Sequence, residues 1–524
     1  MTERLDALVV GAGPTGLTMA CELRRRGLRV RVLDAATEGS HHSKALVIQV
    51  RTLEVFERMG VLPAFLARAH PMIRLNVMGR DAPLAQIKVA NMPGRFPSPV
   101  VLEQSETEAL LLARLRELGG EVEWRSSLVA YHEDADGVTA TVRTPDGEQA
   151  IEAAWLLGCD GSHSAVRRLA GVPFEGSVYE NIFEQADLKI RWSWPQGEGF
   201  GFFRDGGLVV VIPLPRGRYR VMCMGGEHPS NEPTLADFQR MVDEVAPGAE
   251  LYDPEWMVRF KLHLRMVPRM REGRALLAGD AAHIHSPAGG QGMNTGIQDA
   301  FNLAWKLALV QRGRARPGLL DSYDRERRIA AESVLSFSDA AFRRALASGK
   351  LLAWVRPLLI RGLLNRPALQ RIMARKISQT EISYREAGTG VDARRWPRRG
   401  PGPGDRAPDA VLIGPEGQVR LFALLAASGR FALILLPGDR ADPALDAAAA
   451  EITALWPEVL DTYTVLSAAS EAHHDIDGAM YREYAVRPPE LLLVRPDGHI
   501  AARAPIARAA AIDESLERLL GRPQ

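Results

Sequence analysis

Residues 6–34 read DALVVGAGPTGLTMACELRRRGLRVRVLD, and the rest of the chain is organised around them. It opens with an unbroken apolar run, turns through a glycine-rich segment, and then shows a helical pattern that stops at Gly27. A second apolar run follows and ends on Asp34. Because a run that is apolar on both faces is typical of a central parallel strand, the stretch predicts a strand, a turn, a helix and a second strand of an α/β domain.

The glycine spacing of the turn GAGPTG, residues 11–16, indicates a site for a dinucleotide. Gly11 allows the tight turn, Gly13 lets the backbone approach a pyrophosphate, and Gly16 lets the helix pack closely on the strand. The helix start presents free N–H groups and a positive dipole end to phosphates. Asp34 lies 21 residues after Gly13, where a carboxylate can accept hydrogen bonds from a ribose diol. An ordinary glycine-rich turn explains the spacing alone, but the complete order of elements favours a dinucleotide.

The totals of the sequence bound the class of protein. With 524 residues, of which 46% are hydrophobic, the chain can build roughly three domains with large cores. The formal net charge of +1 gives no reason to expect nucleic acid or an anionic membrane as a partner. The cysteines Cys21, Cys159 and Cys223 lie far apart, which is typical of reduced thiols in a cytoplasmic protein. We expect neither a signal peptide nor stable membrane insertion.

Two further places in the chain combine a buried strand with a glycine and an aspartate. An apolar run over residues 153–158 leads to Asp160, and a run over residues 274–278 leads to Gly279 and Asp280. The second of these continues through a glycine-rich loop into a predicted helix that begins near Thr295. Such a loop lets the backbone approach a flat ligand, and the helix start stabilises negative charge.

Histidines occur in two places where a metal site is one interpretation. His283 and His285 lie close to Asp280, and His41 and His42 are adjacent in a polar segment. The glycine loop and the helix dipole fit an anionic or aromatic ligand better than a metal. The adjacent pair points in different directions and has no third ligand nearby. We therefore expect no metal at either place.

Polar residues outside the glycine motifs are further candidates for ligand contacts. Lys44 and Arg51 bracket a predicted helix start, where they either hold phosphate or flavin or are solvated. Ser105 and Glu108 have the spacing of a capping box, which predicts a helix that starts there. Gln104 precedes that cap, where its amide either reaches a cofactor or stabilises the turn.

Changes in composition divide the chain into predicted domains. A nucleotide-binding domain is expected over 1–75, 101–171 and 271–390, a β domain over 76–100 and 172–270, a linker over 391–408 and a last domain over 409–524. One apolar face of the β domain is expected to cover an apolar substrate and to form ordinary core in part. The candidate substrate contacts on its strands are Phe200, Phe202, Val211 and Met222.

The chain thus has three junctions between a buried strand and a loop: the first at Gly11–Gly16, the second at Asp160–Gly161 and the third at Gly279–Asp280. Together they resemble the class A flavoprotein monooxygenases, the FAD-dependent aromatic hydroxylases of the para-hydroxybenzoate hydroxylase type. The resemblance covers about residues 5–390 and rests on three motifs in the family's order. The tail is similar to the thioredoxin-like domain that ends phenol and polyketide hydroxylases, through GDRAP at 404–408 and RPDG at 495–498. Because the tail contains no cysteine, we expect it to have a structural or assembly role rather than thiol chemistry.

The resemblance implies a Rossmann-like FAD-binding domain with an inserted mixed β-sheet for the substrate. It assigns the ADP half of FAD to the first motif, the ribityl chain to Asp280, and both FAD and the nicotinamide cofactor to Asp160. Lys44 stands where the family usually has an arginine, and Gln104 matches a family glutamine. The implied cofactor contacts are Gly11, Ala12, Gly13, Pro14, Thr15, Gly16, Asp34, Lys44, Gln104, Asp160, Gly279, Asp280, Pro287, Gly289, Gly290, Gly292, Met293 and Asn294.

The resemblance also implies the chemistry. NADH or NADPH reduces FAD, dioxygen adds to give a flavin C4a-hydroperoxide, and an aromatic substrate, expected to be a phenol of simple or polycyclic type, takes the hydroxyl. No protein nucleophile is needed, and the candidate catalytic residues are Lys44, Arg51 and Pro287. Epoxidation, N-hydroxylation and Baeyer–Villiger oxidation stay open, as does a flavoprotein that sequesters an intermediate with little turnover. A homodimer is one possible assembly.

Overall fold

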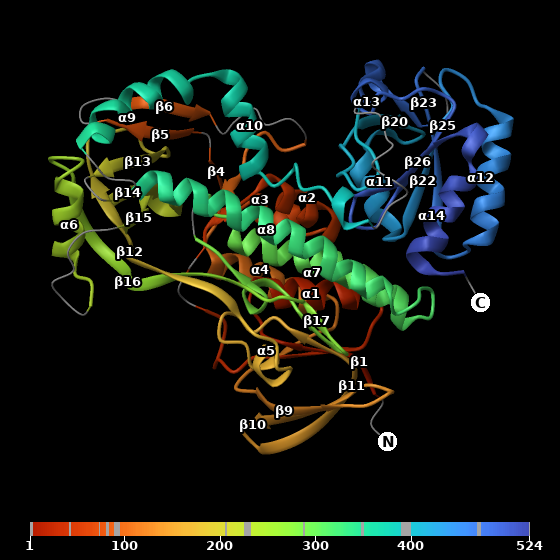
Figure 1. Cartoon of the computed structure of the whole chain (residues 1–524), viewed down its shortest axis with the longest axis horizontal. Helices are drawn as coiled ribbons and strands as arrows, with labels where there is room; N and C mark the ends of the chain where they lie inside the picture. Colours follow the sequence, from red (N-terminus) through yellow and green to blue (C-terminus); the bar gives the residue numbers. More distant parts are fainter. Residues whose placement is uncertain are drawn as a thin grey trace.

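The computed structural model describes residues 4–40, 43, 45–72, 74–79, 83–88, 95–204, 207–224, 232–286, 289–346, 350–388, 400–468 and 473–522. These residues form three large β-sheets and one sheet of three short strands. Helices α7 (Gly292–Gln311) and α8 (Leu319–Leu346) cross the middle of the molecule, with the second large sheet on one side and the C-terminal sheet on the other (Figure 1). None of the helices in the described ranges is long and apolar enough to cross a membrane.

The three junctions lie at the carboxyl ends of three neighbouring strands of the first large sheet. Its order is β17-β18-β11-β1-β2-β8, and β9 and β10 extend it through β11. Val10 at the end of β1 pairs with Gly158 at the end of β11, and Gly158 pairs with Leu277 at the end of β18. Because these strands are parallel, their carboxyl ends lie side by side. The strands are β1 (Leu5–Val10), β2 (Val30–Leu33), β8 (Val122–Glu123), β9 (Ser127–Glu133), β10 (Val138–Thr144), β11 (Gly147–Gly158), β17 (Arg271–Glu272) and β18 (Ala275–Leu277).

Helices cover this sheet because the chain between its strands is amphipathic or apolar. The predicted helix after the first turn is α1 (Pro14–Arg25), and it packs against α7 and α4 (Gln104–Glu117). The helix predicted to begin near Thr295 is α7, which begins three residues earlier, at Gly292. A short helix, α5 (Ala165–Leu169), follows the second junction.

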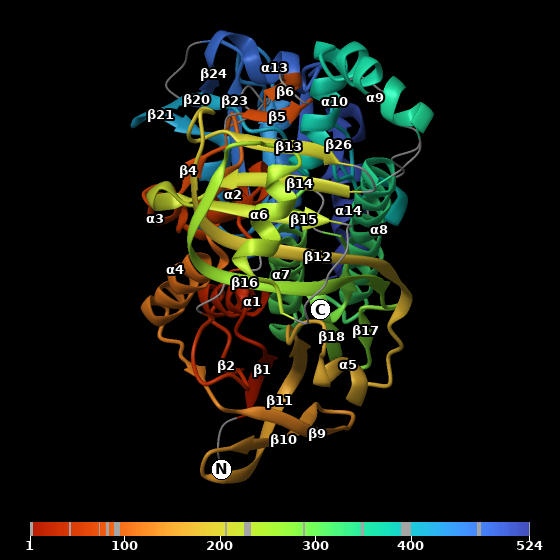
Figure 2. The ribbon, with the colours of Figure 1, turned by 90° about the vertical axis from the view of Figure 1, so that its left-hand side faces the viewer.

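The second large sheet has the order β19-β16-β12-β15-β14-β13-β5-β6. Helix α6 (Leu235–Asp243) lies on the face that is turned away from α7 and α8 (Figures 1 and 2). Helices α9 (Lys350–Leu363) and α10 (Pro367–Ile377) lie along the β6 edge, where the Gln370 side chain donates to the Gln86 carbonyl at 2.9 Å. The strands are β5 (Arg74–Met78), β6 (Pro83–Lys88), β12 (Glu175–Arg191), β13 (Gly199–Arg204), β14 (Gly207–Pro213), β15 (Tyr219–Met224), β16 (Glu250–Met266) and β19 (His283–Ile284).

A small sheet joins these two layers. It has the order β3-β7-β4, with β3 (Val47–Ile48), β7 (Val100–Val101) and β4 (His70–Pro71). Helices α2 (Val50–Met59) and α3 (Leu62–Leu66) follow β3. Val47 lies in an apolar cluster with Ile212 of β14, so the small sheet contacts the inner face of the second large sheet.

The C-terminal sheet has the order β21-β20-β24-β23-β22-β25-β26, and its four neighbouring strands β23, β22, β25 and β26 have the mixed pairing of a thioredoxin-like core. Trp305 of α7 and Leu319 of α8 lie in the same apolar cluster as Phe431 of β22. The C-terminal domain therefore shares part of its core with the first domain. Its elements are β20 (Val411–Gly414), β21 (Gly417–Arg420), α11 (Leu421–Ser428), β22 (Phe431–Leu436), α12 (Pro443–Leu455), β23 (Leu460–Leu466), β24 (His473–Asp475), α13 (Ala479–Glu483), β25 (Glu490–Val494), β26 (Ile500–Pro505) and α14 (Ala510–Leu520).

The segment expected to be a linker, 391–408, is ordered where the structure describes it. Residues 391–399 lie outside the described ranges, whereas Gly404 donates its N–H to the Ile500 carbonyl at 2.8 Å and accepts from Tyr384 N–H at 2.8 Å. Asp405 is bound by the guanidinium of Arg385. Residues 400–408 are therefore an anchored part of the C-terminal domain.

Candidate functional site

The first and second junctions touch each other, and two glycines make this contact possible. Gly11 has a φ of +103°, and a Cβ there would lie 2.3 Å from the carbonyl oxygen of Cys159. A Cβ on Gly16 would lie 1.8 Å from the Gly11 carbonyl oxygen. Both positions exclude any larger residue because backbone atoms occupy the space. The requirement for glycine at these two positions therefore comes from the chain itself.

Gly13 is different from its neighbours. Its φ of −71° suits any residue, and a Cβ there would meet nothing within 4 Å. Neither backbone strain nor crowding within the chain explains a glycine at this position. The space lies at the N-terminus of α1, where free N–H groups and the helix dipole attract phosphate. The arrangement fits a pyrophosphate that approaches the backbone.

Asp34 lies beside the same turn, as the sequence predicted. Its Oδ2 accepts a 2.7 Å hydrogen bond from Ala12 N–H, and its Oδ1 accepts one of 2.8 Å from Ala36 N–H. These bonds hold the carboxylate at the end of β2, next to the glycine turn. Each carboxylate oxygen can accept more than one hydrogen bond, so both can still receive a ribose hydroxyl.

Asp160 follows the second strand end and has a carboxylate oxygen available to a ligand. Its Oδ2 accepts from Ala165 N–H at 2.6 Å and from Val166 N–H at 3.1 Å. Its Oδ1 is buried and has no hydrogen-bond partner among the described residues. Burial raises the pKa of Asp160, although the Ser164 side chain and these backbone N–H groups favour the ionised form. A buried carboxylate oxygen without a partner indicates a donor from outside the chain.

The second and third junctions are joined by Arg167. Its Nη1 donates to the Ala281 carbonyl at 2.9 Å, and its Nη2 donates to the Ser162 carbonyl at 2.8 Å. The guanidinium also lies 3.9 Å from the ring centroid of Phe174. This side chain is buried, so its two hydrogen bonds fix the spacing of the loops after β11 and β18.

The third junction is hydrogen-bonded to Asp299 of α7. Asp299 Oδ2 accepts from Gly279 N–H at 3.0 Å and lies 2.7 Å from His283 Nε2, and its Oδ1 accepts from Arg327 Nε at 2.6 Å. Despite its burial, Arg327 and His283 lower the pKa of Asp299. Asp280, the next residue along the turn, is exposed. His283 is therefore committed to a carboxylate that supports the turn.

The glycine loop before α7 is tied to the small sheet. Asn294 Nδ2 donates to the carbonyls of Val47 (2.7 Å) and Gly290 (2.8 Å), and its Oδ1 accepts from Gln49 N–H (2.8 Å). The Asn294 amide is thus used within the chain, and it positions the loop. A Cβ on Gly290 would lie 3.0 Å from the Cβ of Val47, so the loop lies directly against β3.

His285 lies at the back of this loop. Its Nδ1 lies 2.8 Å from the Ser286 carbonyl, and a Cβ on Gly292 would lie 3.5 Å from its Nε2. Burial lowers the pKa of His285 to about 4, so the ring is neutral at pH 7. Among the described residues, no group of three or more His, Cys, Asp or Glu has the geometry of a metal site.

The other polar candidates have separate positions. Gln104 Oε1 accepts from Ala45 N–H at 3.2 Å and its Nε2 donates to Glu108 at 2.8 Å, so it holds the segment next to the predicted site of Lys44. Arg51 is buried and donates to the Asp497 carbonyl of the C-terminal domain at 2.6 Å, so the structure does not bring it to the glycine loops. Lys44, Pro287, His41 and His42 lie outside the described residues.

The predicted capping box at Ser105 is wrong. Helix α4 begins one residue earlier, at Gln104, and its N-cap is Glu103, whose side chain makes no capping hydrogen bond. The Gln104 N–H is bound instead by Ser43 Oγ at 2.6 Å and by the Ala45 carbonyl at 3.0 Å. A segment some 60 residues away thus satisfies the first turn of the helix.

The candidate substrate residues fall on two faces of the second large sheet. Phe200, Phe202 and Val211 pack with Phe238 of α6 in the outer core. They therefore face away from the glycine loop and cannot reach a ligand there, which corrects their assignment as substrate contacts. Met222 lies on the other face, in the cluster that contains Val47. Because side chains alternate along a strand, the true neighbours of Met222 on β14 are the even-numbered residues, Val210 and Ile212.

Several residues around the site were missed by the sequence reasoning. Asp187 and Arg220 form a buried bidentate pair, with both N–O distances 2.7 Å, on the same face as Met222. Asp299 and Arg327 support the third junction from α7 and α8. One available signal was the presence of two charged residues, Asp299 and Lys306, in the largely apolar helical run IQDAFNLAWKLALV, because a charge in such a run needs a buried partner.

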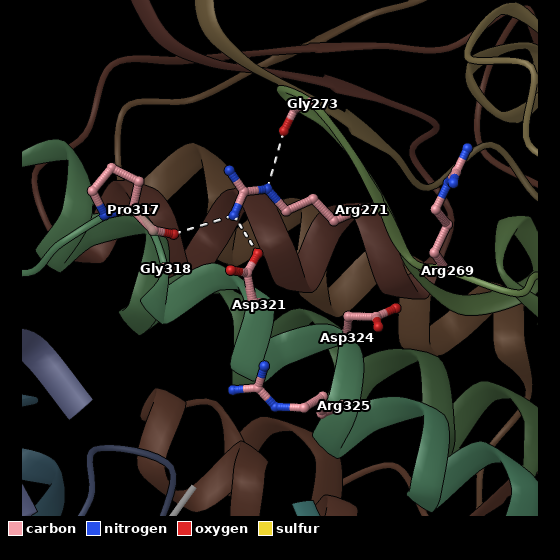
Figure 3. A pocket seen from close by; sticks show the side chains of 8 residues that line it. All are labelled: Arg269, Arg271, Gly273, Pro317, Gly318, Asp321, Asp324 and Arg325. Carbon is pink, nitrogen blue, oxygen red and sulfur yellow. Dashed lines mark hydrogen bonds and ion pairs between the residues drawn. The ribbon is translucent and has the colours of Figure 1, made fainter. Parts of the chain in front are cut away.

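A surface depression of about 590 Å³ lies at the start of β18 and α8, at the other end of β18 from Gly279 (Figure 3). Arg271 crosses it and donates to Asp321 at 2.7 Å, to the Pro317 carbonyl at 3.2 Å and to the Gly273 carbonyl at 3.0 Å. Arg271 and its acceptors thus use their hydrogen-bonding groups within the depression. The depression lies at the opposite end of β18 from the three junctions, so it is separate from the candidate site.

Comparisons with known proteins agree with this geometry. The family model described as FAD binding domain matches residues 4–338, and the model described as aromatic-ring hydroxylase, C-terminal, matches residues 400–523. The chain is 33% identical to pentachlorophenol 4-monooxygenase of Sphingobium chlorophenolicum, over 98% of this chain and 96% of that protein. It is 35% identical to the 12-dehydrotetracycline 5-monooxygenase/anhydrotetracycline 6-monooxygenase of Streptomyces rimosus, over 99% of each chain.

Solved structures are similar over the whole chain. The anhydrotetracycline hydroxylase OxyS from Streptomyces rimosus is 33% identical, with a TM-score of 0.81 and coverage of 100% of both chains. A ternary complex of aklavinone-11 hydroxylase with FAD and aklavinone is 25% identical, with a TM-score of 0.81 and the same coverage. The similarity includes the C-terminal domain as well as the three junctions.

Proposed function

This chain belongs to the FAD-dependent aromatic-ring hydroxylases, and from this premise we propose that it hydroxylates a polycyclic phenol with electrons from NADPH or NADH. It is an FAD-dependent aromatic monooxygenase, and FAD is its cofactor. The proposal that the substrate is polycyclic is supported by two similar proteins, whose names state tetracycline and aklavinone substrates. When bound, FAD supplies the redox chemistry by which dioxygen is activated.

The proposed binding site of FAD lies at the carboxyl ends of β1, β11 and β18. The observation that supports this most strongly is that Val10, Gly158 and Leu277 are in register, so the three glycine-containing turns that follow them meet at one place. The residues fit the cofactor, because Gly13 leaves open space at the start of α1 and Asp160 has a buried, unpartnered oxygen. Asp34 then holds the ribose of the ADP half, and Asp280 the ribityl chain.

The loop 289–294 and the start of α7 are proposed to hold the flavin ring. The Asn294 amide locks this loop to Val47 and Gln49, so the first N–H groups of α7 have a fixed direction. A helix N-terminus stabilises negative charge on a ring placed against it. Asn294 acts on the ring through this backbone arrangement, since its side chain is already bonded.

The inner face of the second large sheet is proposed to bind the substrate. Val210, Ile212 and Met222 form an apolar surface with Leu46 and Val47, and Val47 also contacts the glycine loop. An apolar cover over the loop excludes water from the reacting ring. The buried pair Asp187–Arg220 borders this surface and gives it one polar edge. We propose the domain division of the sequence with two changes: α9 and α10 belong with this sheet, and residues 400–408 belong with the C-terminal domain.

The test is a substrate-dependent measurement on the purified, FAD-loaded protein. NADPH and NADH consumption is followed without substrate, with simple phenols, and with polycyclic phenols of the anthracyclinone and tetracycline types. We expect polycyclic phenols to accelerate consumption most, and labelled oxygen from dioxygen to appear on an aromatic carbon. Label that arrives only from water, or peroxide that accounts for all reducing equivalents, would overturn hydroxylation. Oxygen inserted beside a carbonyl would identify Baeyer–Villiger oxidation instead.

A further inference from the structure

The turn Arg495-Pro496-Asp497-Gly498 of the C-terminal domain is buried against α7 and α8 of the first domain. Arg495 and Asp497 are each only 2% exposed. Arg495 donates to both carboxylate oxygens of Glu326 on α8, at 2.6 and 2.7 Å. Asp497 Oδ2 accepts from Asn302 Nδ2 at 3.0 Å and from Trp305 Nε1 at 3.3 Å, both on α7. The turn therefore bonds to both helices that support the third junction.

A third helix binds the backbone of the same turn. Arg51 Nη2 donates to the Asp497 carbonyl at 2.6 Å, and Arg58 Nη1 donates to the Pro496 carbonyl at 3.0 Å. Both arginines lie on α2, directly after the β3 strand to which the glycine loop is tied. The groups that meet here are charged and buried, so each depends on its partners.

The turn is connected to Gly279 through two consecutive residues of α8 and the carboxylate of Asp299. Glu326 binds Arg495, and the next residue on α8, Arg327, donates to Asp299 at 2.6 Å. Asp299 in turn accepts the Gly279 N–H. The hydrogen bonds therefore run from α8 to the turn that contains Asp280.

Tyr384 makes a second connection between Arg327 and the C-terminal domain. Its hydroxyl accepts from Arg327 Nη1 at 2.8 Å, and its ring lies 4.2 Å from the ring of His499 and 5.4 Å from the guanidinium of Arg495. Tyr384 is 2% exposed. One side chain thus contacts both the C-terminal domain and the guanidinium that fixes Asp299.

We propose that the C-terminal domain is a positioning element for the cofactor turn, and that Tyr384 is the positioning residue that transmits its contact through Arg327 and Asp299 to Gly279. The inference rests on the proposed placement of Gly279–Asp280 at FAD. It gives the cysteine-free thioredoxin-like domain a defined role: its His499 and Arg495 hold Tyr384 in place, and Tyr384 holds the guanidinium that orients the carboxylate under the turn.

The primary test compares two tyrosines in the full chain. Tyr384→Phe removes only the hydroxyl that binds Arg327. Tyr484→Phe is the matched control, because Tyr484 is fully buried in the C-terminal domain and its hydroxyl donates to the Pro408 carbonyl at 2.5 Å. FAD release on dilution of the holoprotein is measured by free-flavin fluorescence. The unfolding midpoint of the FAD-stripped chain and the visible spectrum of the bound flavin are measured in parallel.

Tyr384→Phe is expected to raise the FAD dissociation constant about tenfold, the loss typical of one hydrogen bond to a charged group, and to shift the flavin absorption bands. Tyr484→Phe is expected to leave both unchanged. His499→Ala should weaken FAD binding like Tyr384→Phe, and His499→Phe should restore it because a ring again packs on Tyr384.

Three results would overturn the inference: equal effects of the two tyrosine variants, an FAD loss that only follows a lower unfolding midpoint, or no FAD loss in Tyr384→Phe and His499→Ala. Asp280→Ala separates this outcome from the underlying placement. If Asp280→Ala weakens FAD binding and Tyr384→Phe does not, the placement stands and the positioning role is wrong. If Asp280→Ala has wild-type affinity, the placement of the turn at FAD is itself wrong.

Discussion

Arg167 on α5 donates a 2.9 Å hydrogen bond to the carbonyl oxygen of Ala281, which follows Asp280 in the third junction. The same guanidinium donates to Ser162 in the second junction. Two loops that are more than 100 residues apart in the chain are thereby held at one spacing by a single planar group. A planar fork can reach two carbonyls at once, whereas an ammonium on a flexible stem cannot hold both in fixed geometry.

We therefore expect Arg167→Lys to bind FAD about tenfold more weakly, because hydrogen bonds from a charged group contribute roughly 1.5–3 kcal/mol. The measurement is FAD release from the diluted holoprotein. Arg168→Lys is the control, since Arg168 is the exposed neighbour on the same short helix. If both substitutions have the same effect, Arg167 does not set the spacing of the junctions.

Two glycines of the first turn should separate stability from cofactor binding. Gly13→Ala places a Cβ in open space, so the free energy of unfolding should change by less than about 1 kcal/mol, while FAD affinity falls because the methyl occupies the expected pyrophosphate position. Gly16→Ala places a Cβ 1.8 Å from the Gly11 carbonyl oxygen and should destabilise the apoprotein itself, by roughly 1–3 kcal/mol or more. Denaturant unfolding of both apoproteins checks this. A Gly13→Ala protein with wild-type FAD affinity would contradict the proposed binding site.

The two faces of the β domain should give opposite results on substitution. Met222→Ala, on the inner face, is expected to raise the KM for the aromatic substrate with little change in the FAD dissociation constant. Val211→Ala, in the core under α6, should instead lower the free energy of unfolding by about 2 kcal/mol, because it leaves a cavity, and should leave the KM unchanged. The assignment of faces is wrong if Val211→Ala changes the KM and Met222→Ala does not.

Acidification should weaken the contact of the C-terminal domain through His499. Burial, with help from Arg51 and Arg495, lowers the pKa of His499 from 6.5 to about 4 despite the nearby Asp497. The unfolded chain therefore takes up a proton at a higher pH than the folded chain does. The stability from this group is complete above pH 6.5 and is lost as the pH falls towards 4, by up to about 3 kcal/mol.

Urea unfolding of the wild type and of His499→Phe between pH 7 and pH 4 measures this contribution. His499→Phe should show a shallower decline, because it has no group to protonate at this position. His132→Gln, an exposed histidine on β9, should keep the wild-type slope. Parallel pH curves for wild type and His499→Phe would contradict the prediction.

The three junctions could be predicted because each is encoded within a short stretch. The strand, the glycine and the aspartate are neighbours in sequence, and their register in a parallel sheet follows once the strands are in place. The helix α1 was predicted for the same reason. The family models and the whole-chain similarities confirm the fold and the aromatic hydroxylase family.

The faces and long-range contacts could not be predicted in this way. Alternation along β13 and β14 gives two faces but does not say that α6 covers the one with Phe200 and Val211. The role of Arg51 depends on a carbonyl 446 residues away, and that of Asp299 on Arg327 of the next helix. Arg51 also pairs with Glu54, three residues away, but nothing near Arg51 or Asp299 in the sequence identifies these distant partners. The assignments of Asp34, Asp160 and Asp280 to FAD atoms stay predictions.

The burial of the Arg495–Gly498 turn has a consequence for the order in which this enzyme can be made. The turn binds Glu326, Asn302, Arg51 and Arg58, which precede their partners in the turn by 169, 195, 446 and 438 residues. During synthesis these four side chains therefore leave the ribosome long before the turn that binds them. We expect the protein to retain its cofactor only once residues 495–498 have been made, so that a stop codon placed before Arg495 yields protein without flavin.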